Sequence, residues 1–197
     1  LLFDDCLMGS IEVAAEVSGL AYYAVVSETI GWSSNLNYSH VLGMLTDDSG
    51  MNGEEAARGL VQMEHLKDDE YYVTQCVAAY DLNRTAELLV AMNAFILDLY
   101  ESWYYDATGM ETARLNADTF DLNGDDLVDL YQMVQLSMLY CSSDEMNLTG
   151  RVVLDMLDPA NASPVVLMFR NTSSADFCHG MSVYFPEEAD AFDDGYY

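Results

Sequence analysis

Cys6 is the residue of this sequence that is best placed for covalent chemistry. It follows a short apolar run, residues 1–3, and the small residues Gly9 and Ser10 after it predict a turn into a helix. Folds of the α/β class place reactive groups where a strand ends beside a helix N-terminus, and the helix dipole there favours a thiolate over a thiol. The pattern therefore predicts a nucleophilic cysteine. A buried structural thiol, a common state of cysteine, is the alternative that position alone leaves open.

A cysteine nucleophile needs a general base, because only a small fraction of an ordinary thiol is ionised at neutral pH. The sequence has three histidines, His40, His65 and His179, and none of them precedes Cys6. His179 forms a His-Gly pair with Gly180 just before an expected strand, whereas the other two fall in segments with helical spacing. A histidine on the surface or in the core is the more common case. The sequence therefore leaves the base open.

Two patterns bear on metal binding. Residues 121–125 supply oxygen ligands at the spacing that begins a Ca²⁺ loop, but Asp126 stands where such a loop needs glycine and Gln132 where it needs glutamate. We therefore expect a turn and a helix N-cap in this segment. The cysteines other than Cys6 are widely separated and form no C-x-x-C pair, which argues against a zinc site. They are Cys76, Cys141 and Cys178.

The composition is that of a folded but strongly acidic protein. Hydrophobic residues make up 51% of the 197 residues, which is enough for one domain with a sizeable core. Six Lys and Arg against 34 Asp and Glu give a net charge of −28, which excludes nucleic acid as a partner. Basic peptides and cations are the partners that such a field attracts, and a solvated acidic surface is the alternative. No apolar run reaches the roughly 18 residues of a membrane span.

Strands and helices are expected to alternate along the chain. Apolar and β-branched runs predict strands over residues 21–27, 71–80, 152–157, 165–169 and 181–185. Helical spacing predicts helices over residues 10–17, 38–45, 54–66, 82–102, 109–116 and 125–140. This alternation favours an α/β layered domain with a mainly parallel sheet flanked by helices. Residues 187–197 form an acidic, aromatic tail.

Residues 3–14 resemble the nucleophile segment FDACLMGSxEVA of the clostripain family of cysteine peptidases, which belongs with caspases, gingipains and legumain. Asp5 stands where that family usually has alanine. Further blocks are similar to family segments and follow in the family's order. They are residues 27–38 (SEETEPGxGWxY), 79–82 (SAIDLS), 128–131 (VDLYDF) and 180–186 (GLSIYFP).

The resemblance implies a caspase-like layered domain whose N-terminal strands are missing from this chain. Residues 1–197 would then be the nucleophile-bearing, heavy-chain-like part of a cysteine endopeptidase, with Cys6 as the catalytic residue. The family's base is a histidine in a His-Gly turn upstream of the nucleophile. This chain would therefore be inactive alone and would need a His-bearing light chain or upstream segment. A catalytically inactive surface, assembly or binding module with the same fold is the alternative.

Asp4 matches an acidic residue that in the family lines the pocket for a basic P1 side chain, which implies peptide or protein substrates cleaved after Arg or Lys. The alternative for Asp4 is that it caps or orders the turn that follows. The family's second pocket acid has no counterpart in residues 29–36. The chemistry requires no cofactor, but the resemblance implies that calcium can bind, through ligands that it does not identify. It also implies secretion or a cell-surface location in a prokaryote.

Overall fold

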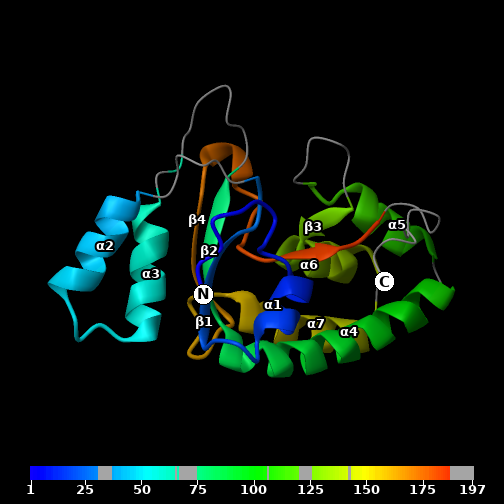
Figure 1. Cartoon of the computed structure of the whole chain (residues 1–197). Coiled ribbons are helices and arrows are strands. Elements are labelled where there is room, and N and C mark those ends of the chain that lie inside the picture. Colours follow the sequence, from blue (N-terminus) through cyan, green and yellow to red (C-terminus); the bar gives the residue numbers. More distant parts are fainter. Residues whose placement is uncertain are drawn as a thin grey trace.

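Helices cover both faces of a central sheet (Figure 1). The computed structural model describes residues 1–30, 37–64, 66, 75–105, 107–119, 126–141 and 143–186. The central sheet has the strand order β1-β2-β4, and a smaller sheet pairs β3 with β5. The strands are β1 (Tyr23–Ser27), β2 (Cys76–Asp81), β3 (Leu127–Asp129), β4 (Val166–Asn171) and β5 (Ser182–Tyr184).

The prediction of a mainly parallel sheet is wrong for the described residues, because every pair of named strands is antiparallel. Leu2 with Val25 and Ser10 with Ser182 form parallel pairs, but only as isolated bridges. The reason lies in the connection from β1 to β2, which contains two helices, α2 (Tyr38–Asp47) and α3 (Gly53–Met63), packed on each other. A single crossover helix favours parallel neighbours, whereas a pair of helices returns the chain to the end of the sheet that it left.

The other helices follow the predicted segments closely, apart from a helix over residues 144–157 that was not predicted. α1 begins directly after Ser10, whose Oγ accepts a hydrogen bond from the Val13 N–H at 3.3 Å, as expected for an N-cap. The ends of the remaining helices differ from the prediction by a few residues. The helices are α1 (Ile11–Val17), α4 (Thr85–Tyr105), α5 (Ala107–Leu115), α6 (Leu130–Tyr140) and α7 (Asp144–Leu157), with short 3-10 turns at Leu82–Arg84 and Ser173–Ala175.

The strand predicted over residues 152–157 is wrong, because this segment forms the last turns of α7. Its β-branched residues fit a strand locally. However, Gly150, Val153 and Leu157 recur at helical spacing, and all three are buried. An amphipathic helix that buries this stripe against α4 therefore prevails over the local strand propensity.

The helix predicted over residues 125–140 begins later than expected. Residues 127–129 form β3 instead, and α6 starts at Leu130. The N-cap is Asp129, whose Oδ1 accepts a hydrogen bond from the Gln132 N–H at 2.6 Å. The cap was expected near residue 125, so pairing of Val128 with Val183 of β5 moves the helix start toward the C-terminus.

The largest apolar cluster lies between the sheet and the helices α1, α4, α6 and α7. The helix α4 contributes Leu88, Met92, Phe95 and Leu99, which share one side of the helix and are all buried. Tyr80 of β2 is fully buried in the same cluster. None of the helices in the described part of the chain combines the length and the apolar character that crossing a lipid bilayer requires.

We expect Tyr80→Phe to lower the free energy of unfolding by about 1–2 kcal/mol, because a buried donor is lost while its acceptors remain. The Tyr80 hydroxyl lies 2.8 Å from the carbonyl oxygen of Gly9 and also contacts that of Gly180. Urea unfolding measures the change. Tyr22→Phe is the matched control, since Tyr22 is 73% exposed. Equal destabilisation by the two substitutions would show that the Tyr80 hydroxyl does not join these segments.

Candidate active site

Cys6 lies where the sequence predicts it, between the end of a strand-like segment and the start of a helix. Residues 1–3 run parallel to β1, with the Phe3 N–H donating to Val25 O and the Val25 N–H to Leu1 O, both at 2.9 Å. Residues 4–9, which we name the Cys6 turn, lead from this segment toward α1. Cys6 itself is half-buried. Its position therefore combines a backbone anchored to the sheet with partial access to solvent.

Two backbone hydrogen bonds hold the Cys6 turn against the end of β1. The Leu7 N–H donates to Thr29 O at 3.0 Å, and the Gly9 N–H donates to Ser27 O at 2.8 Å. A Cβ atom on Gly9 would lie only 2.6 Å from the Cα of Glu28, so a larger residue would push the turn away from the strand. Glycine at this position is therefore required by the close approach of the two backbones.

Leu7, the residue after Cys6, has a left-handed backbone with φ of 59°. This conformation costs a non-glycine residue about 1–2 kcal/mol. The Leu7 side chain packs against the buried cluster of Cys76, Ala175 and Cys178, which offsets part of that cost. Strained residues of this kind concentrate at functional sites, where they fix an otherwise unfavourable geometry.

Asp4 and Asp5 point to different partners. The Cys6 N–H donates to Asp5 Oδ1 at 2.8 Å, so Asp5 orders the start of the turn. The exposed Asp4 carboxylate accepts a hydrogen bond from the Tyr38 hydroxyl at the first residue of α2. This hydrogen bond raises the pKa of Tyr38, because the neutral phenol is the form that donates. Asp4 thus faces the start of α2 rather than the backbone of the turn.

Glu64 is an acidic neighbour of Asp4 that sequence reasoning missed. Burial and the nearby charge of Asp4 raise the pKa of Glu64 to about 7, against a smaller opposing effect of Arg170. Arg170 donates to the carbonyl oxygens of Gln62 at 2.8 Å and Glu64 at 3.0 Å, and so caps the C-terminus of α3. In the sequence, Glu64 is one more acid at a helix end. The packing of α3 on β1, the strand to which residues 1–3 are bonded, brings it near Asp4.

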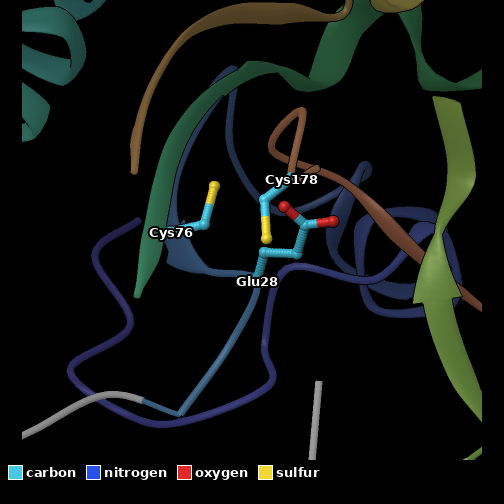
Figure 2. A group of neighbouring side chains, drawn as sticks. All are labelled: Glu28, Cys76 and Cys178. Atoms are coloured by element: carbon cyan, nitrogen blue, oxygen red, sulfur yellow. The ribbon is translucent and has the colours of Figure 1, made fainter. Parts of the chain in front are cut away.

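Behind the Cys6 turn, three buried groups gather around one point: the carboxyl of Glu28 and the thiols of Cys76 and Cys178 (Figure 2). Glu28 follows β1 directly, Cys76 opens β2, and Cys178 precedes β5. Burial raises the pKa of each group, most strongly for Glu28 and Cys76. In the sequence the two cysteines are only widely separated thiols, and no local pattern marks Glu28.

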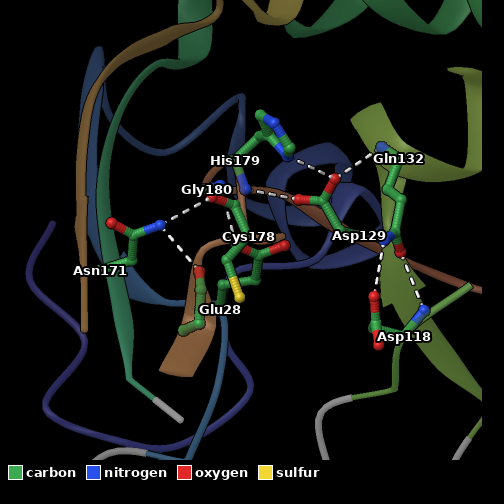
Figure 3. A network of polar contacts seen from close by, with 9 residues as sticks. Glu28, Asp118, Asp129, Gln132, Asn171, Cys178, His179 and Gly180 are labelled. Atoms are coloured by element: carbon green, nitrogen blue, oxygen red, sulfur yellow. Dashed lines mark hydrogen bonds and ion pairs between the residues drawn. The ribbon is translucent and has the colours of Figure 1, made fainter. Parts of the chain in front are cut away.

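His179 is held by the buried Asp129 in a network of polar contacts (Figure 3). Asp129 Oδ2 accepts the His179 N–H at 2.7 Å, and Oδ1 lies 3.0 Å from the ring Nδ1. The ring also stacks on Tyr131 at 4.4 Å between centroids. Burial alone lowers the pKa of His179, but the hydrogen bond and charge of Asp129 outweigh it, so the pKa lies above its ordinary value. These contacts give His179 a defined orientation.

The other sequence candidates are placed as follows. His40 is exposed on α2. His65, the calcium-loop residues 121–125 and the acidic tail 187–197 lie outside the described residues. Most of the loop over residues 29–36 lies outside them as well.

The site thus combines a layered α/β domain with a half-buried cysteine between a strand segment and a helix. The chain belongs to the Clostripain family, whose model matches residues 1–197. The comparison with curated proteins found no match.

Three solved structures show the same fold. An inactive zymogen protease from Parabacteroides distasonis has a TM-score of 0.63 and 18% identity, over 95% of this chain and 52% of that chain. A secreted cysteine protease from Bacteroides thetaiotaomicron, iotapain, has a TM-score of 0.62 and 16% identity, over 93% and 48%. A clostripain from Bacteroides thetaiotaomicron in complex with the peptide inhibitor BTN-VLTK-AOMK has a TM-score of 0.55 and 17% identity, over 93% and 77%. The chain thus spans about half the length of the first two proteases.

We expect Glu64→Gln to flatten the pH dependence of stability between about pH 4.5 and 7. The folded protein keeps the Glu64 proton up to about pH 7, whereas the unfolded chain loses it near 4.5. The folded state therefore binds more protons in this window, and the contribution of Glu64 to stability falls as pH rises. Melting temperatures at pH 5 and pH 8 measure the effect. Glu16→Gln, on the exposed face of α1, is the control, and equal slopes in all three proteins would contradict the prediction.

Proposed function

We propose that this chain is the nucleophile-bearing part of a cysteine endopeptidase, with Cys6 as the catalytic residue. The observation that carries the proposal is the Cys6 turn, a strained backbone fixed to the end of β1 that leaves Cys6 half-buried. Membership of the Clostripain family and the shared fold support it. The substrates are peptides or proteins.

The proposed reaction is acyl transfer through a thioester. The Cys6 thiolate attacks the scissile carbonyl carbon, and the tetrahedral intermediate collapses with loss of the amine, which takes a proton from the base. Water then attacks the thioester, so that the acid product leaves and the thiol is restored. The base in this proposal is a histidine on a His-bearing light chain or upstream segment. Backbone N–H groups, including that of Cys6, would hold the oxyanion.

Asp5 favours a second candidate function, a catalytically inactive clostripain-like binding or assembly module. Its carboxylate accepts the Cys6 N–H at 2.8 Å, the same donor that the reaction would direct at the oxyanion. A fixed negative charge at that point opposes a developing oxyanion. In an active enzyme the exposed Asp5 side chain must therefore turn away when substrate binds. In an inactive module it can stay.

We also propose that Asp4 binds the basic P1 side chain of the substrate. The Asp4 carboxylate is exposed beside the Cys6 turn and is held by the Tyr38 hydroxyl. The charge of Asp4 helps to raise the pKa of the nearby Glu64. Glu64 would therefore ionise and add a second negative charge once a cation binds. Charge-assisted pairing with Lys or Arg is the expected recognition. Calcium as a regulator and secretion or a cell-surface location are further proposals, which rest on the family resemblance.

We expect a lysyl acyloxymethyl ketone peptide to modify the full-length protein once per chain and to leave Cys6→Ala unmodified, because only an activated thiolate displaces the acyloxy group. Intact mass spectrometry under denaturing conditions measures the adduct and also detects any co-purifying chain with a His-Gly turn. Cys141→Ser is the matched control, since Cys141 is buried away from the turn. Equal modification of the wild-type and Cys6→Ala proteins would refute the nucleophile, and an unmodified wild-type protein would favour the inactive module.

Asp4→Asn should lower the preference for lysine over norleucine at P1 by about 10- to 100-fold, since a hydrogen bond to a charged group contributes roughly 1.5–3 kcal/mol. Inactivation rates with a matched pair of acyloxymethyl ketone peptides give the ratio. Asp5→Asn removes the same charge from the same turn and should change both rates alike. A lysine preference that survives Asp4→Asn would place the P1 pocket elsewhere.

A further inference from the structure

Glu28, Cys76 and Cys178 bring three metal-binding atoms together inside the protein (Figure 2). One carboxylate oxygen and the two sulfur atoms all lie within 4.8 Å of one another. The three residues are fully or almost fully buried, at 0%, 1% and 1% exposure. Both cysteines are thiols rather than halves of a disulfide. Two thiols, which are soft metal ligands, and one carboxyl group are thus enclosed where water has little access.

The Glu28 carboxyl is incompletely satisfied. Its Oε2 accepts the Gly180 N–H at 2.8 Å, whereas Oε1 is buried and makes no hydrogen bond of normal geometry to a described residue, although the Asp129 carboxyl and the Cys76 thiol lie close to the Glu28 carboxyl. A buried polar atom without a partner is costly, and a buried anion more so. The fully buried Asp129 places a second carboxyl beside Glu28. A cation bound by the group would give the Glu28 carboxyl a further partner and offset the negative charge of the two acids.

The backbone holds the three residues in fixed positions. The Glu28 N–H donates to Cys76 O at 2.9 Å, and the Cys76 N–H donates to the buried Thr29 Oγ1 at 2.8 Å. Cys76 pairs across the sheet with Asn171, whose side-chain amide donates to Cys178 O at 3.2 Å. Each of the three segments is therefore tied to a neighbour, so little rearrangement of the backbone is needed to close the site on an ion.

We propose that Glu28, Cys76 and Cys178 bind one Zn²⁺ ion. Zinc takes thiolates at about 2.3 Å and carboxylate oxygens at about 2.0–2.2 Å in a tetrahedron, which places neighbouring ligand atoms less than about 4 Å apart. The observed separations reach this arrangement by small side-chain rotations. Thiolate ligands select zinc over calcium and magnesium. The three ligands release their protons as the ion binds.

The sequence spacing argues against zinc because the ligands are far apart along the chain, but the fold removes that objection. The ion would join the end of β1, the start of β2 and the approach to β5. Leu7 packs against the cluster that contains Cys76 and Cys178, and the Leu7 N–H donates to the carbonyl of Thr29, the residue after Glu28. The zinc site would therefore support the Cys6 turn from behind. The proposal is independent of peptidase activity, because its primary readout is bound metal.

The test is metal analysis of the full-length protein purified without chelators or metal-affinity resin and then equilibrated with Zn²⁺. We expect one zinc per chain in the wild-type protein. Cys141→Ser should bind the same amount, because it removes a buried thiol that is not part of the site. Cys76→Ser and Cys178→Ser should lose more than nine-tenths of it. Wild-type protein loaded with Co²⁺ should show thiolate-to-cobalt charge-transfer absorption and the visible bands of tetrahedral cobalt.

Serine variants can also lose metal by unfolding, so two readouts address the folded protein directly. Glu28→Gln keeps the shape of the side chain and should weaken zinc binding at least tenfold in a protein whose circular dichroism is unchanged. Chelation of the wild-type protein should lower its melting temperature, and Zn²⁺ should restore it.

Three results would overturn the proposal. The first is no zinc at saturating concentration with two alkylatable thiols at Cys76 and Cys178. The second is a protein lighter by two hydrogens with a Cys76–Cys178 cross-linked peptide, which would make the pair a disulfide. The third is zinc bound equally by the wild-type protein, Glu28→Gln and both serine variants, which would place the ion elsewhere.

Discussion

The pairing of the first nine residues with β1 is the interaction on which the rest of the site depends. Backbone hydrogen bonds join Phe3 to Val25, Leu7 to Thr29 and Gly9 to Ser27. Without them, the backbone around Cys6 would lose these bonds to the sheet, and the position of the thiol would be less well defined. With them, the backbone around Cys6 is held on the central sheet, and these bonds also stabilise the left-handed conformation of Leu7.

The same strand carries the constraint into the interior. Glu28 follows β1 directly, and its neighbour Thr29 binds both the Cys6 turn and the backbone of Cys76. Tyr80, one strand away, reaches the carbonyls of Gly9 and Gly180 from the core. A change in the packing of Glu28 or Cys76 can therefore be transmitted to the Cys6 turn through one intervening residue, Thr29. This is why the packing behind Cys6 and its reactivity should vary together.

Local signals in the sequence were enough to predict the position of Cys6 and the start of α1. Ser10 is an N-cap in the sequence as in the structure, and most helices were visible from their spacing. The direction of β2 was not predictable, because it depends on how α2 and α3 pack in space. Glu64 and the Glu28–Cys76–Cys178 cluster were missed for the same reason. Their chemistry arises from contacts between residues that are distant in the chain, which no local pattern records.

The large excess of acid acts differently inside the fold and on its surface. Of the few cations, Arg58 pairs with Glu54 within α3, Arg84 of the 3-10 turn pairs with Glu87 of α4, and Arg170 caps α3. The net charge of −28 already includes all six basic residues, so none of them is left to balance this excess. A field of that sign concentrates cations and basic peptides near the surface, and it weakens as salt is added. Local recognition by Asp4 and cation uptake by a buried site would both draw on this field. The acidity is therefore better understood as part of how ligands reach the protein than as part of what holds it together.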